Sequence, residues 1–230
     1  MKVSVVIAAF NEEEYIGRCL DALNSQKVKA DEVIVVDNNS TDNTARIAKE
    51  KGVRVIKESK QGASYARNKG FDTATGDIIL RTDADTIVPK NWVMTMKKHF
   101  ADPKVSIVCG GVVYYKKWLN PLSHLLIYWI DDIFGYKAIT GPNFGIRAET
   151  WKKVREEVHA DDSSFHEDLD LSIHAQRFGK YVRDYGMTVE TSSRKVGNVG
   201  VFFVDYPTKW IRTVFHPVHR KLSSNPLMKL

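Results

Sequence analysis

The chain of 230 residues contains only two cysteines and has no long, uninterrupted apolar run. Two widely separated cysteines match no zinc-binding or disulfide framework, so we expect a protein of a reducing compartment. The most apolar later segment, 122–136, is interrupted by Asp131 and Asp132 and is too short to span a bilayer. The apolar start runs directly into acids at 12–14, unlike a signal peptide. We therefore expect a cytoplasmic protein, soluble or peripheral on the inner face of the cell membrane.

The sequence also lacks the glycine-rich fingerprint of dinucleotide-binding proteins, because its first apolar run leads into Ala8-Ala9-Phe10-Asn11. This argues against a dinucleotide oxidoreductase. The net charge of +6 predicts an anionic partner, which could be nucleic acid, a phosphorylated substrate or an acidic membrane. The positive charge concentrates near the C-terminus and no nucleic-acid recognition motif is present, so we expect no nucleic-acid partner. Hydrophobic residues at 43% are typical of a globular protein with a core.

Apolar runs and helical patterns alternate through the first 85 residues. Strands are predicted at 2–9, 32–36, 53–56 and 78–82, and helices at 16–23, 45–51 and 62–71. This alternation predicts a parallel sheet with right-handed crossovers. The pattern then changes, and further elements are predicted as helices at 89–100, 121–134 and 167–178 and as strands at 105–115, within 139–147, at 181–183 and at 187–191.

Polar residues follow the ends of the first strands, which should meet at one edge of the sheet. Asp83 and Asp85 come directly after a buried run, and Asp37 follows the second strand. Ligands bind at this edge in open α/β sheets, and carboxylates suit Mg²⁺ or Mn²⁺ shared with substrate phosphates. Solvated acids are the alternative for the aspartates, and helix capping is the alternative for Asn11.

Two further groups carry charge that could act on a substrate. Arg67 lies on a predicted helix and could steady a diphosphate or pair with an aspartate; a solvated surface arginine is the alternative. Asp168 lies at the start of another predicted helix, where a carboxylate could take a proton from an acceptor hydroxyl. The alternative for Asp168 is an acid that stabilises the helix dipole.

Five motifs in order resemble glycosyltransferase family 2 over residues 2 to about 195. They are VVIAAFNE at 5–12, VVDNNSTD at 35–42, ARN at 66–68, DAD at 83–85 and EDLDL at 167–171. The resemblance implies a GT-A fold, with a mostly parallel central sheet flanked by helices, a smaller acceptor-side region and a C-terminal helical tail. The implied domain covers 1–204, with a nucleotide-sugar half at 1–100 and an acceptor half at 101–204.

The resemblance also implies roles for individual residues. Asp85 is similar to the ligand of a Mn²⁺ or Mg²⁺ cofactor, and Asp168 to the catalytic base. The residues similar to those that bind the nucleotide are Ala8, Phe10, Asn11, Glu12, Asp37, Asn39, Arg67, Asp83 and Ala84. The residues similar to those that contact or orient the acceptor are Glu167, Asp170, Gly141 and Asn143.

The implied activity is an inverting, metal-dependent transfer of a sugar from a nucleotide-diphosphate sugar to an acceptor hydroxyl. A UDP-sugar is favoured over a GDP-sugar, and the acceptor would be a glycan or a lipid-linked sugar. No QxxRW-type motif is present, which argues against a polymerising synthase. The alternative is a non-catalytic nucleotide-binding regulatory or scaffold protein that keeps the fold, and the pair Asp85 and Asp168 argues against it.

The tail at 205–230 has no acidic residue beyond Asp205, and it is rich in lysine and arginine. Its apolar residues recur at helical spacing at Trp210, Ile211, Val214, Phe215 and Val218, and Pro217 should break the helix. Such a face could lie on an anionic membrane or dock on the catalytic domain.

Overall fold

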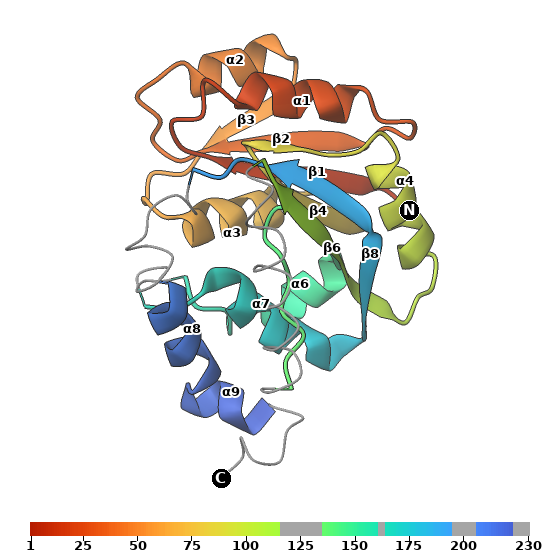
Figure 1. Ribbon diagram of the computed structural model, residues 1–230, viewed down its shortest axis with the longest axis vertical. Coiled ribbons are helices and arrows are strands. Elements are labelled where there is room, and N and C mark those ends of the chain that lie inside the picture. The colour runs from red at the N-terminus through yellow and green to blue at the C-terminus, as the bar shows by residue number, and fades with distance from the viewer. Residues whose placement is uncertain (116–134, 161–163, 195–205, 223–230) are drawn as a thin grey trace.

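The computed structural model describes residues 1–115, 135–160, 164–194 and 206–222. Across these ranges one mixed sheet forms the centre of the molecule, with helices on both faces (Figure 1). The strand order is β3-β2-β1-β4-β7-β6-β8-β5. The α/β class and the mostly parallel sheet predicted from the sequence are confirmed. The helix predicted at 121–134 lies outside the described residues.

The first half of the chain folds as the alternation of patterns predicts. Four parallel strands are β1 (Val3–Ala9), β2 (Glu32–Asp37), β3 (Arg54–Lys57) and β4 (Ile78–Asp83). The helices between them are α1 (Ile16–Asn24), α2 (Thr44–Glu50) and α3 (Ala63–Thr73). Gly52 ends the second helical segment with a positive φ of 75°, a conformation that favours glycine.

The second half adds strands to the same sheet in mixed directions. Strand β7 (Phe144–Arg147) lies antiparallel between β4 and β6 (Val105–Tyr114). Strand β8 (Lys180–Thr191) runs parallel to β6, and the short β5 (Thr86–Ile87) pairs antiparallel with β8.

The two short strands predicted near the end of this half are one strand, β8. Gly110 pairs with Asp184 and the next residue, Gly111, pairs with Thr188, so residues 185–187 bulge out of the register. A bulge interrupts the alternation of side chains without ending the strand. The sequence pattern therefore breaks although the backbone pairing continues.

Two apolar layers hold the helices to the sheet. Helices α1, α2 and α4 (Trp92–Phe100) cover one face, and Val3, Val5 and Ile7 point toward them. Helices α3, α6 (Ala148–Val154) and α7 (Glu167–Ala175) cover the other face, which includes Val6. A 3₁₀ turn (Gln176–Phe178) continues α7. The side chains of β1 alternate between the two layers, as expected of a central strand.

Helices α8 (Tyr206–Val214) and α9 (Pro217–Leu222) lie on the far side of α7 from the sheet (Figure 1). The predicted break at Pro217 is confirmed, because α8 ends before it and α9 begins with it. Val214 is buried against Leu169 and Ile173 of α7. Among the described residues, no helix combines the length and the apolar character needed to cross a membrane.

Candidate active site

The register of the parallel strands brings the predicted site residues to one edge of the sheet. Ala8 of β1 pairs with Asp83 of β4, and Ala9 pairs with Asp37 of β2. These are the last residues of their strands or next to the last. The expectation that the three strand ends meet at one edge is therefore confirmed.

Hydrogen bonds join the loops that follow β1 and β2. The Asn11 side chain accepts from the Thr41 N–H at 2.8 Å, and the Glu12 N–H donates to the Thr44 hydroxyl at 2.7 Å. Asn11 has a positive φ of 53° and is not a helix cap, because α1 begins only at Ile16, after Tyr15. The capping interpretation of Asn11 is wrong, since Thr41 occupies its side-chain oxygen.

Three residues predicted to bind the nucleotide lie on or beside these loops. Asp37 is 8% exposed and its Oδ1 accepts from the Ser40 N–H at 3.2 Å. Asn39 has a φ of 65° and its amide donates to the Ser59 carbonyl at 2.7 Å. The ring of Phe10 is exposed at the same edge, where a flat base could stack on it.

Asp85 is buried, and hydroxyl groups fix its carboxylate. Its Oδ1 accepts from Thr191 at 3.2 Å, and its Oδ2 accepts from Ser192. Thr191 is the last residue of β8 and Ser192 follows it, so the end of β8 supplies both donors. Neighbouring Ala84 is buried in the core beneath the two aspartates.

Arg194 is a cation at this site that the sequence analysis missed. Its guanidinium donates to Glu12 at 2.7 Å and lies 3.7 Å from Asp85 Oδ2, and it also stacks over the Tyr15 ring. Its side chain is 41% exposed. The sequence feature that could have indicated Arg194 is its position just after the last predicted strand, at 187–191.

Arg81 is the second missed residue, and it joins the two halves of the site. It donates to Asp168 Oδ1 at 2.6 Å and Glu167 Oε1 at 3.0 Å, and it lies 3.3 Å from Asp83 Oδ1. Its side chain is 5% exposed. The signal in the sequence was an arginine within the apolar run of β4, because a buried charge must meet opposite charges.

Arg67 is fully buried on α3, so the interpretation as a solvated surface residue is wrong. It donates to the Glu167 carbonyl at 3.0 Å, and it lies 3.5 Å from the Glu167 carboxylate. The predicted pairing with an acid is present, with a glutamate in place of an aspartate. Arg67 thereby fixes the first turn of α7, which carries Asp168.

The same charges set the ionisation of the acids on α7. Burial raises the pKa of Asp168 to about 6; Arg81 opposes this shift, and Glu167 reinforces it. Burial alone would raise the pKa of Glu167, but Arg81 and Arg67 outweigh it and lower the pKa to about 2. Asp168 is therefore the more basic of the two carboxylates, and it is mainly ionised at neutral pH.

The predicted acceptor-side residues separate into different environments. The backbone at Gly141 passes so close to Asp168 that an added Cβ would lie 2.4 Å from Oδ2. Asn143 is fully buried, donates to the carbonyls of Gly111 and Met187, and accepts from the Trp92 ring. Asn143 therefore holds the sheet together, and we propose no acceptor contact for it.

Asp170 lies on α7 away from this network. It is fully buried and contacts three histidines instead of an arginine. The structure thus brings together Asp83, Glu167 and Asp168 through Arg81, and Glu12 and Asp85 through Arg194. It does not place Asp170 with them.

Comparisons with solved structures confirm the GT-A architecture. A mannosyltransferase from Pyrobaculum calidifontis, solved with GDP-mannose and Mn²⁺, superposes with a TM-score of 0.76 at 20% identity, covering 95% of this chain and 64% of that one. Glucosyl-3-phosphoglycerate synthase from Mycobacterium tuberculosis, solved with UDP-glucose and Mn²⁺, gives a TM-score of 0.67 at 20% identity, covering 92% and 79%.

Sequence relatives agree with this architecture. The chain is 32% identical over 119 residues to glycosyltransferase GlyG of Streptococcus pneumoniae, covering 49% of this chain and 40% of the relative. It is 30% identical over 208 residues to the probable glycosyltransferase YdaM of Bacillus subtilis, covering 79% and 48%. The matched part spans less than half the length of each relative. The family model described as glycosyl transferase family 2 matches residues 4–161, so the chain belongs to that family.

Proposed function

We propose that the chain is a glycosyltransferase that moves a sugar, with inversion, from a nucleotide-diphosphate sugar to an acceptor hydroxyl. The observation that carries this proposal is the position of Arg81, which contacts Asp83 on the donor side and Asp168 on the acceptor side. One side chain thereby links the donor edge of the sheet to a carboxylate that can act as a base.

The residues at the sheet edge fit a divalent cofactor, Mn²⁺ or Mg²⁺. Asp85 offers a buried carboxylate surrounded by the hydroxyl oxygens of Thr191 and Ser192, which is a hard, all-oxygen donor set. Such ions bind through one or two carboxylates and complete their shell with phosphates and water. When bound, the ion would neutralise the charge that develops on the departing diphosphate.

The chain's own residues would bind the donor around this point. Asp37 and Asn39 line the nucleoside side of the edge, and the exposed Phe10 ring offers a surface for the base. Arg194 lies 3.7 Å from Asp85, and its half-exposed guanidinium could reach a diphosphate. The two similar structures described above were solved with GDP-mannose and UDP-glucose, so we propose a UDP-sugar or a GDP-sugar as donor.

Asp168 is the proposed base. Arg81 holds Oδ1, whereas Oδ2 takes no hydrogen bond within the described part of the chain and faces the backbone at Gly141. A pKa near 6 leaves the carboxylate ionised at neutral pH and able to accept a proton from a hydroxyl. A single base that activates the acceptor for direct displacement gives inversion at the anomeric carbon.

The test is a thermal-shift and turnover screen of UDP, GDP and their sugars, with and without Mn²⁺. The matching nucleotide should stabilise the protein in the presence of Mn²⁺, by about 2.7 kcal/mol at a concentration 100 times Kd. Asp85→Ala should remove the Mn²⁺-dependent part of this stabilisation. Nucleotide binding without sugar transfer to any glycan or lipid-linked acceptor would support a regulatory protein instead.

We also propose that the tail lies on an anionic membrane surface. One face of α8 packs on α7 through Val214, whereas Ile211, Phe215 and Val218 are 57%, 49% and 46% exposed. The apolar residues predicted to form one stripe therefore divide between a docked face and an outer face. The exposed residues are accompanied by lysine and arginine, a combination that suits the interface of an anionic bilayer.

A further inference from the structure

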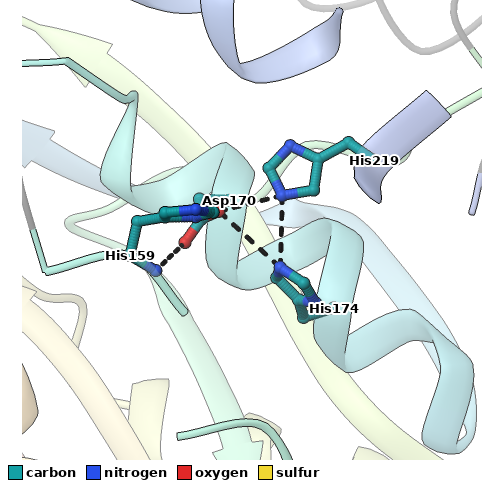
Figure 2. Close-up of side chains that lie close together, drawn as sticks. All are labelled: His159, Asp170, His174 and His219. Carbon is teal, nitrogen blue, oxygen red and sulfur yellow. Dashed lines mark hydrogen bonds and ion pairs between the residues drawn. The ribbon is translucent and has the colours of Figure 1, made fainter. Parts of the chain in front are cut away.

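A cluster of three histidines and one aspartate lies beneath the tail, outside the site described above (Figure 2). Asp170 and His174 lie one helical turn apart on α7, His219 comes from α9, and His159 comes from the segment between α6 and α7. One nitrogen or oxygen atom from each residue lies within 4.8 Å of the others. Asp170, His174 and His219 are buried, whereas His159 is partly exposed.

Short distances join the four atoms. Asp170 Oδ1 lies 2.8 Å from His159 Nδ1, 3.0 Å from His219 Nε2 and 3.8 Å from His174 Nε2. The two Nε2 atoms lie 3.1 Å apart. Ligands bound to one zinc ion at 2.0–2.2 Å in a tetrahedron are roughly 3.3–3.6 Å from one another. Small side-chain movements would therefore bring the four atoms to a zinc ion.

The hydrogen bonds of Nδ1 in His219 and His174 determine the tautomer of each ring. His219 Nδ1 lies 2.5 Å from the Thr213 carbonyl oxygen, and His174 Nδ1 lies 3.1 Å from a Glu157 carboxylate oxygen. The Thr213 carbonyl and the Glu157 carboxylate can only accept hydrogen bonds, so each Nδ1 carries the proton. In each neutral ring, Nε2 then carries a lone pair. Two lone pairs and a carboxylate oxygen thus face each other in a buried space, an arrangement that a bound cation would stabilise.

A metal ion satisfies this arrangement better than a proton. A proton on His219 Nε2 can serve its contacts to Asp170 Oδ1 and His174 Nε2, whereas a metal ion would bind all four ligand atoms at once. Three imidazole nitrogens and one carboxylate oxygen are ligands that suit Zn²⁺, and four protein ligands close its shell. The outer contacts to Thr213 and Glu157 are the partners that orient metal-binding imidazoles in proteins.

We propose that His159, Asp170, His174 and His219 bind one structural Zn²⁺ that joins the tail to α7. The ion would link α9 to the helix whose first turn carries Asp168. It shares no ligand with the Asp85 site, so this proposal can fail while the proposed function holds. Widely spaced histidines gave no recognisable zinc motif in the sequence; only Asp170 and His174 have a local helical spacing.

The test uses the full chain with Asp85→Asn, so that the proposed Mn²⁺ site does not bind the added metal. The protein is stripped with a chelator and titrated with Zn²⁺ by calorimetry. Its metal content is then measured after dialysis. We expect one zinc ion per chain and a higher Tm than that of the stripped protein. His219→Ala should weaken zinc binding by at least about 100-fold. The control is His99→Ala, because His99 also pairs with a carboxylate, Asp184 at 2.8 Å, but lies outside the cluster, and it should retain zinc.

Two additional measurements cover the case in which His219→Ala does not fold. His159→Ala removes a partly exposed ligand on a connecting segment, and it should also lose zinc. Co²⁺ bound to the unaltered cluster should give the intense visible absorption of tetrahedral coordination, and Zn²⁺ should displace it. Three results would overturn the proposal: no stoichiometric zinc binding, an octahedral cobalt spectrum, or a zinc affinity in the His159 and His219 variants equal to that of the chain with the intact cluster.

Discussion

Asp168 and Asp170 lie two residues apart on α7, yet their neighbours differ completely. Asp168 contacts the guanidinium of Arg81, whereas Asp170 contacts the imidazoles of His159 and His219. Both carboxylates are buried. The two sides of one short helix thus carry two clusters, one built on arginine and the other on histidine.

The difference between arginine and histidine explains what each cluster can do. A guanidinium is always charged and only donates, so Arg81 fixes the geometry of Asp168 without any added ion. A neutral imidazole offers a lone pair, so the Asp170 cluster is completed by a cation from outside. The helix therefore separates a carboxylate that Arg81 already holds from a cluster that, in our proposal, depends on an added ion.

The largest expected effect separates the two aspartates directly. Asp168→Asn should lower sugar transfer by about 10²–10⁴-fold, because the acceptor loses its base. Nucleotide binding should persist, since the donor residues lie on the sheet edge. Asp170→Asn is the matched control and should keep most of the turnover while losing zinc. Steady-state kinetics and nucleotide titrations measure both; equal losses of transfer in the two variants would remove the distinction.

The second prediction concerns stability. Arg81→Met leaves Asp168 buried without its partner and leaves Glu167 with Arg67 alone, so the free energy of unfolding should fall by about 3–5 kcal/mol. The control is Arg46→Met, which breaks an exposed pair with Glu50 at 2.6 Å and should cost about 0–1 kcal/mol. Urea unfolding of both variants gives the comparison. Similar losses would mean that the Arg81 network contributes no more than a surface ion pair.

Glycine substitutions test the packing against Asp168. Gly141→Ala places a Cβ 2.4 Å from Asp168 Oδ2, so the carboxylate must move, and kcat should fall by about 10–100-fold. Gly17→Ala, on helix α1, is the matched control. Its added Cβ would lie 3.8 Å from Ile47 of α2, which is an ordinary contact distance. It should leave kcat unchanged and stabilise the protein slightly. Unchanged turnover in Gly141→Ala would show that Asp168 has room to move and is not held for catalysis.

The meeting of polar strand ends at one edge of the sheet could be predicted from the sequence because its signals are local. Apolar β-branched runs give β1 and β4, and the polar residues that end them, such as Asp37 and Asp83, follow within one or two positions. Parallel pairing then places those residues at one edge without any knowledge of side-chain contacts. The same reasoning could not find α6, which has a short and weakly patterned sequence.

The clusters on α7 could not be predicted because their members are far apart in the chain. Arg81 meets Asp168 across 87 residues, and His219 meets Asp170 across 49 residues. No spacing rule relates such positions; only the packing of α7 between the sheet and the tail brings them together. A charged residue inside an apolar strand was the one available signal, and it pointed to Arg81 but not to its partners.

The smallest expected effect concerns the outer face of the tail, which the Asp170 cluster would hold in place. Ile211→Ser with Val218→Ser removes two exposed apolar side chains of this outer face, so stability should be nearly unchanged. Binding to vesicles with anionic lipids should fall severalfold, because apolar burial and charge act together at a bilayer interface. Met94→Ser, at an exposed position of α4, is the control.

If the double variant co-sediments with vesicles as well as the control does, the outer face serves another purpose. If His159→Ala weakens co-sedimentation with vesicles but not Mn²⁺-dependent nucleotide binding, zinc fixes the tail without shaping the donor edge, and the two sides of α7 act independently.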